Sequence, residues 1–198
     1  MNYLAHAYLA APDADCIVGG VMGDFVKGPL PGALAPALAR GVGLHRAIDS
    51  YAETHPAFQR SRARVSAGRR RVSGIMVDLF YDHFLAQDWA RYVEEPLAHF
   101  SARVYALLAA QPALPERLEE VLPLMRTHDW LQSYARIEVV GRALDRMARY
   151  RLRQPNPLEG ALEELQRDYA GFATDFAAFL PDARDFAQDW LAQRPLQH

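Results

Sequence analysis

Apolar side chains recur three to five residues apart along most of this chain, whereas the period-two alternation that marks strands is almost absent. The clearest case is the segment 70–92, in which Ile75, Leu79 and Phe84 follow helical spacing. This periodicity predicts helices and gives no support for a sheet. We therefore expect an all-α protein, a single-domain helical bundle that spans residues 1–198.

The same spacing, with the positions of proline and glycine, predicts the remaining helices. They are expected at residues 2–10, from 13 or 15 to about 26, 33–40, from about 44 to 55, 57–66, 95–110, 115–126, 129–150, 158–179 and 182–193. Gly41 and Gly43 lie close to the start of the helix expected from about residue 44. Pro181 is expected to kink or end the helix that begins near residue 158.

Composition narrows the function classes. The net charge of −2 gives no indication of nucleic-acid binding. The single cysteine, Cys16, excludes an internal disulfide and fits a reducing compartment. The apolar N-terminal segment has no preceding basic residue, which is atypical of a secretory signal, and no apolar run approaches the length of a membrane span. We expect a cytoplasmic protein with no nucleic-acid partner and no membrane span, and the oligomeric state stays open.

The most informative polar residues are histidines and aspartates within apolar helices of the N-terminal half. They are His6, Asp24, His45, Asp49, Asp78, Asp82 and His83. Two pairs of them are spaced four residues apart, so the members of each pair share one helix face. Carboxylates are rarely buried without a partner, and mixed imidazole and carboxylate ligands suit Mn, Fe, Zn or Mg. Taken singly, each residue could instead be a hydrogen-bonded core residue or a salt-bridge partner of Arg46 or Arg71.

A basic stretch lies beside these helices. Residues 60–71 contain six arginines and no acidic residue: Arg60, Arg62, Arg64, Arg69, Arg70 and Arg71. Such a field would attract an acidic macromolecule or a phosphorylated ligand, and a solvated basic surface without a partner is the alternative. No aromatic residues interleave these arginines as a stacking platform for RNA would require. We interpret a second basic run, within residues 142–153, as structural.

Four short motifs occur in an order that resembles one family. They are Asn2-Tyr3-Leu4-Ala5-His6, Gly23-Asp24-Phe25-Val26, His45-Arg46-Ala47-Ile48-Asp49 and Asp78-Leu79-Phe80-Tyr81-Asp82-His83-Phe84-Leu85. Their order resembles the acyl carrier protein phosphodiesterases, a family similar to the HD-type metal phosphohydrolases. The resemblance implies an HD-phosphohydrolase-like all-α fold and a divalent metal, most often Mn²⁺, with Mg²⁺ or Fe²⁺ as alternatives. It also implies a reaction that removes 4′-phosphopantetheine from a serine of holo acyl carrier protein.

On this basis we assign hypothetical roles. The metal ligands would be His6, Asp24, His45, Asp82 and His83. Asp78 and Asp49 would act as a base or orient a ligand, and Arg46 would stabilise charge on the phosphoryl oxygens. The six arginines of residues 60–71 would bind the acidic carrier protein, because acyl carrier proteins are strongly acidic.

Two other functions stay open from the sequence. The first is an HD-like phosphohydrolase that acts on a nucleotide or another small phosphate ester with the same metal pocket. The second is a helical protein that binds an acidic partner without catalysis. Nucleotide binding through a glycine-rich phosphate loop has no support in the sequence.

Overall fold

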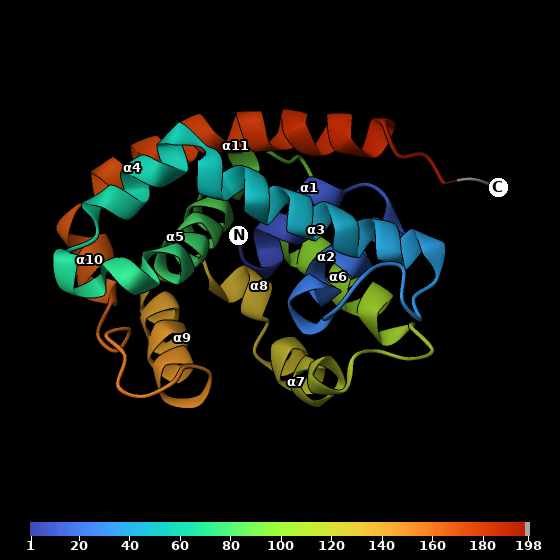
Figure 1. Ribbon diagram of the computed structural model, residues 1–198, viewed down its shortest axis with the longest axis horizontal. Helices are drawn as coiled ribbons and strands as arrows, with labels where there is room; N and C mark the ends of the chain where they lie inside the picture. The colour runs from blue at the N-terminus through green and yellow to red at the C-terminus, as the bar shows by residue number, and fades with distance from the viewer. Residues whose placement is uncertain (197–198) are drawn as a thin grey trace.

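The computed structural model describes residues 1–196, and the regular structure within that range is entirely helical (Figure 1). The α-helices are α1 Tyr3–Ala10, α2 Ala14–Met22, α3 Pro36–Thr54, α4 Pro56–Arg64, α5 Ser73–Gln87, α6 Leu97–Ala109, α7 Glu116–Thr127, α8 Trp130–Ser133, α9 Ile137–Tyr150, α10 Leu162–Arg167 and α11 Tyr169–Ala192. Short 3₁₀ helices are η1 Gly23–Phe25, η2 Ala67–Val72 and η3 Trp89–Arg91. The all-α prediction is confirmed. The prediction of a single domain is confirmed for residues 1–196, which share one hydrophobic core, and residues 197 and 198 lie outside the described range.

Helix α5 forms the centre of the core. It is apolar on nearly every side, and Phe80 and Tyr81 are fully buried. Their rings make edge contacts with Phe172 and Phe176 of α11. In Figure 1, α11 runs along one edge of the molecule with α4 and α3 beneath it, and α7, α8 and α9 lie on the opposite side. A helix that is apolar all round has to be enclosed in this way, because it has no face suited to water.

Helices α2 and α3 pack closely through two glycines. A Cβ atom on Gly19 would lie 2.6 Å from the Cα of Gly41, and one on Gly41 would lie 2.8 Å from the backbone of Cys16. The expected break near Gly41 is wrong, because α3 continues from Pro36 to Thr54. Glycine serves close backbone approach here rather than chain termination.

Two further boundaries differ from the predictions. The helix expected over 129–150 is divided into α8 and α9, and Asp129 caps α8 from a left-handed conformation (φ 39°). Helix α11 passes through Pro181 without ending. Pro181 has no N–H group to donate to the carbonyl of Ala177. Ala177 is an exposed residue, so water can donate a hydrogen bond in place of the missing N–H. Within residues 1–196, no helix combines the length and the apolar character needed to cross a bilayer.

Candidate metal centre

Helices α1 and α3 bring three of the predicted residues together. The imidazole rings of His6 and His45 stack with their centroids 3.7 Å apart. The two oxygens of Asp49 lie 3.2 Å from the Nε2 atoms of His6 and His45, one oxygen to each ring. One ligand atom from each of the three side chains lies within 4.8 Å of the other two. This spacing suits a single shared cation.

The position of His45 depends on two glycines. Its Nδ1 lies 2.8 Å from the carbonyl oxygen of Gly20, so this nitrogen has to donate and Nε2 is the atom that faces Asp49. A Cβ atom on Gly23 would lie 2.1 Å from the ring of His45. The sequence drew attention to Gly23 only as part of a motif, because its contact with a ring 22 positions later becomes visible only in the fold.

Two further predicted carboxylates lie at the rim of this cluster. Asp24 Oδ1 is 3.7 Å from Nε2 of His45. Asp78 Oδ1 is 2.8 Å from the α-amino nitrogen of Met1, which is also 2.9 Å from Asp49 Oδ1. The Asp24 and Asp49 side chains are 39% and 42% exposed, whereas His6 is 1% exposed. The imidazoles therefore form a buried floor, and the carboxylates line its open side.

Burial affects the charge states of the histidine and aspartate side chains in this cluster. It lowers the pKa of His6 to about 3, with a further contribution from His45, so His6 is neutral at physiological pH. Burial would raise the pKa of Asp49, but the adjacent imidazoles of His45 and His6 and the α-amino group of Met1 hold that pKa far below its usual value. Burial raises the pKa of Asp78 as well. A neutral imidazole beside an ionised carboxylate is the protonation pattern that a metal ion requires.

Nε2 of His45 faces carboxylate oxygens from two residues. Because Nδ1 of His45 donates to Gly20, Nε2 is the ring nitrogen that remains to bind an ion, and it faces the oxygens of Asp49 and Asp24. The α-amino group of Met1 supplies one positive charge beside Asp49, and a divalent ion bound among these three side chains would supply another. In addition, Nδ1 of His6 is buried and has no hydrogen-bond partner among residues 1–196. The donor set of two imidazoles and carboxylates fits a divalent transition metal.

Two predicted ligands lie outside this cluster. Both carboxylate oxygens of Asp82 accept backbone N–H groups at the start of α1, from Leu4 at 2.9 Å and from Ala5 at 3.1 Å. The ring of His83 contacts the carbonyl of Tyr134 at 2.8 Å and the hydroxyl of Tyr169 at 2.9 Å. Neither is among the three side chains whose ligand atoms converge. Both side chains have partners elsewhere in the fold, and metal binding by Asp82 and His83 stays a prediction.

Arg46 makes its contacts with the loop beside the centre. Its guanidinium donates to the carbonyls of Gly28 and Val26, at 2.9 and 3.1 Å. These bonds hold the loop that follows Asp24, so Arg46 positions the rim of the centre in the structure. Its predicted contact with phosphoryl oxygens stays a prediction.

The arginine stretch is tied into the fold by acidic residues about a hundred positions later. Arg60 and Arg64 both bond to Asp175, at 2.9 and 2.7 Å. Arg69 pairs with the buried Glu164. The remaining three donate to other groups: Arg62 to the Ser73 hydroxyl, Arg70 to the carbonyls of Ala63 and Val65, and Arg71 to that of Pro155. The predicted free basic surface is thus largely a set of links between α4, η2 and the C-terminal helices, and substrate binding by it stays a prediction.

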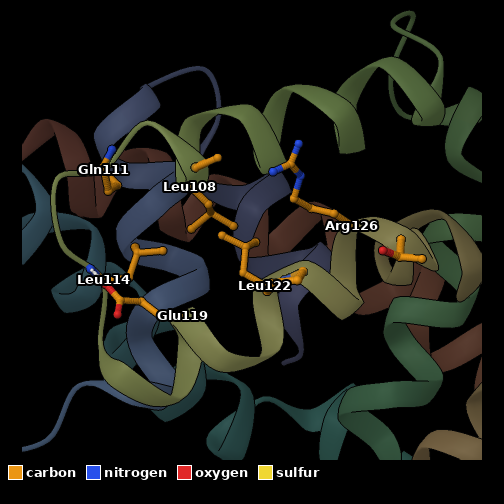
Figure 2. Close-up of a pocket in the computed structure, with 9 residues that line it drawn as sticks. Leu108, Gln111, Leu114, Glu119, Leu122 and Arg126 are labelled. Carbon is orange, nitrogen blue, oxygen red and sulfur yellow. Dashed lines mark hydrogen bonds between the residues drawn. The ribbon is translucent and has the colours of Figure 1, made fainter.

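A separate hollow lies away from the His/Asp cluster. It measures about 660 Å³ and is formed by α6 and α7, with Leu108, Leu114 and Leu122 among its lining residues (Figure 2). None of its lining residues belongs to the His/Asp cluster. The candidate metal centre and this hollow are therefore separate sites.

Comparisons with known proteins agree with the motif order. The family described as acyl carrier protein phosphodiesterase matches residues 1–183. A protein of that name from Serratia proteamaculans is 33% identical over 193 residues, which cover 96% of this chain and 98% of the relative. Another protein of that name, from Yersinia enterocolitica, is 30% identical over 191 residues, which cover 96% of this chain and 98% of the relative.

A third, from Photorhabdus laumondii, is 31% identical over 193 residues, with 96% of each chain covered. No solved structure matches this chain, so its similarity to HD-type phosphohydrolases stays a prediction. A match over nearly the whole length, together with relatives of the same name, establishes the relationship. The chain belongs to the acyl carrier protein phosphodiesterase family of hydrolases.

Proposed function

We propose that this protein is a metal-dependent phosphodiesterase that cleaves 4′-phosphopantetheine from a serine of holo acyl carrier protein and releases the apo form. The relatives named acyl carrier protein phosphodiesterase support the substrate class. One observation supports the metal above all others: the convergence of His6, His45 and Asp49 at the floor of an open centre.

The residues of the centre would have separate roles in metal binding and in proton transfer. His6, His45 and Asp49 would hold the ion, and Asp24 lies at the rim where it could complete the ligand set. A divalent ion bound there would polarise a phosphoryl oxygen and lower the pKa of a bound water. Asp78 lies at the rim with its side chain largely buried, and this burial raises the pKa of its carboxyl group. A carboxyl group with a raised pKa suits proton transfer from water to the leaving serine oxygen.

The second function, hydrolysis of a small phosphate ester, would use the same centre. The arginine stretch does not distinguish the two hypotheses, because Arg60, Arg64 and Arg69 are paired with acidic residues of this protein. Substrate size therefore has to be tested directly.

The experiment is a mass measurement of holo acyl carrier protein after incubation with the purified enzyme. We expect a loss of the phosphopantetheine mass in Mn²⁺, none after chelation, and recovery on addition of Mn²⁺. Asp49→Asn serves as the inactive control, and Arg184→Glu as a control at an exposed residue outside the centre. Turnover of a small diester without any release from the carrier protein would favour the small-ester hydrolase. A protein that binds the carrier protein without cleaving it, with or without metal, would favour the binding function.

A further inference from the structure

The exposed side of α9 and the residues after it form a second basic surface. Residues 137–153 contain five arginines against one glutamate and one aspartate, a formal charge of +3 in a chain of net charge −2. Arg142, Arg146 and Tyr150 follow one another at intervals of four, so they form one stripe along the helix. All three are exposed, and Tyr150 is 78% exposed.

These arginines differ from those of residues 60–71 in their partners. Arg149 is paired with Glu159, but among the described residues no carboxylate lies within 4.0 Å of Arg142, Arg146 or Arg153. The nearby Asp145 accepts the backbone N–H of Gly160. Within the described fold no carboxylate neutralises Arg142, Arg146 or Arg153, whereas Arg149 and Arg151 have partners there.

The same surface adjoins the candidate metal centre. Arg151 Nη1 lies 3.5 Å from the hydroxyl of Tyr3. The ring of Tyr3 stacks on that of Phe25, the residue after Asp24, with their centroids 6.0 Å apart. Burial raises the pKa of Tyr3, and the charges of Arg151 and, more weakly, of Arg117 on α7 oppose that shift. Basic groups from α7 and from the end of α9 thus meet beside the rim that carries Asp24.

We infer that an α9 arginine face, consisting of Arg142, Arg146, Tyr150, Arg151 and Arg153, is the docking surface for the acidic protein that carries the scissile phosphodiester. This inference rests on the proposed function. Free arginines would steer an acidic partner toward the centre, and an exposed tyrosine among arginines has the side-chain composition of an interface hot spot. A nucleic acid is disfavoured because the whole molecule is negatively charged.

Binding of apo acyl carrier protein tests this surface without any cleavage, because the apo form lacks the scissile bond. We would titrate it, at low and at physiological salt, against the wild type and Arg142→Glu/Arg146→Glu. The matched control is Arg91→Glu/Arg184→Glu, which makes the same change of charge at two exposed residues on η3 and α11. The α9 variant should raise Kd at least about tenfold and weaken its salt dependence, while the control stays within about twofold.

Thermal unfolding of each variant shows whether it is folded. A second variant, Arg153→Glu, changes a residue beyond the end of α9 and so leaves the packing of that helix unchanged. Equal affinity of the α9 variants and the control would overturn the inference. A loss of affinity for the carrier protein that occurs only in the Arg70→Glu/Arg71→Glu variant would also overturn it. Tighter binding of an oligonucleotide than of the carrier protein would do the same. Failure of the proposed function would show instead as intact holo carrier protein after incubation with the wild type.

Discussion

Replacing Gly23 with alanine should disable the metal centre through one methyl group. The Cβ atom would lie 2.1 Å from Cγ and 2.4 Å from Nδ1 of His45. Ordinary contact begins at 3.4 Å, so the ring would have to retreat by about 1.3 Å. It has little room to do so, because it stacks on His6 at 3.7 Å and is bonded to the carbonyl of Gly20.

This displacement exceeds what a metal site tolerates. Ligand distances in such sites vary by about 0.2 Å, so a shift of this size removes His45 from the ligand set. We expect metal affinity to fall by at least about 100-fold, and kcat/KM to fall by about the same factor. Overpacking should cost about 1–3 kcal/mol of unfolding free energy, which leaves the protein folded.

The assay combines Mn²⁺ titration by calorimetry with kcat/KM for the carrier protein and with thermal unfolding. The control is Gly74→Ala, where a Cβ atom meets nothing within 4 Å. Gly23→Ala with wild-type metal affinity and activity would refute the reasoning, since His45 would then be dispensable or differently placed.

Three other perturbations test the roles that the structure assigns. Asp82→Ala should lower the unfolding free energy by about 2–4 kcal/mol in denaturant titrations, because two buried backbone N–H groups of α1 lose their acceptors. Unchanged stability together with a loss of metal binding would instead identify Asp82 as a metal ligand. Burial raises the pKa of Asp82 from 3.8 to about 7, so the folded protein keeps a proton that the unfolded chain releases. The resulting stabilisation is complete below pH 3.8 and is lost as pH rises through about 7. Urea titrations across this range should show that the free energy of unfolding falls more steeply with pH for the wild type than for Asp82→Asn. Asp175→Ala should destabilise by about 3–5 kcal/mol, because Arg60 and Arg64 lose a shared buried partner, while folded molecules keep their kcat. A kcat reduced in proportion to the stability loss would contradict that separation.

The sequence predicted much of the centre because local spacing determines part of it. His45 and Asp49, four residues apart on α3, share a face, and His6 belongs to an apolar helix that had to be buried. Asp78 and Asp82 also share a face, yet they have different partners. Asp78 contacts the α-amino group of Met1, while Asp82 caps α1. Helical spacing does not indicate which backbone N–H groups of another helix need an acceptor.

The arginines illustrate the same limit at longer range. Residues 60–71 contain no acidic residue, so their charge looked free from the sequence. Their partners, Asp168 and Asp175, come from α11 and its cap about a hundred residues later. The run on α9 looked structural because of its helical spacing, although Arg142 and Arg146 have no acidic partner within the described range. Charge neutralisation depends on tertiary contacts that periodicity does not encode.

The most direct test of the metal centre is a crystal structure of the protein soaked in Mn²⁺, with anomalous difference density to locate the ion. We expect a peak bonded to His6, His45 and Asp49, with Asp24 at its exposed side, and its loss in Asp49→Asn crystals. A peak bound by Asp82 or His83, or no peak at this cluster in saturating Mn²⁺, would contradict the assignment.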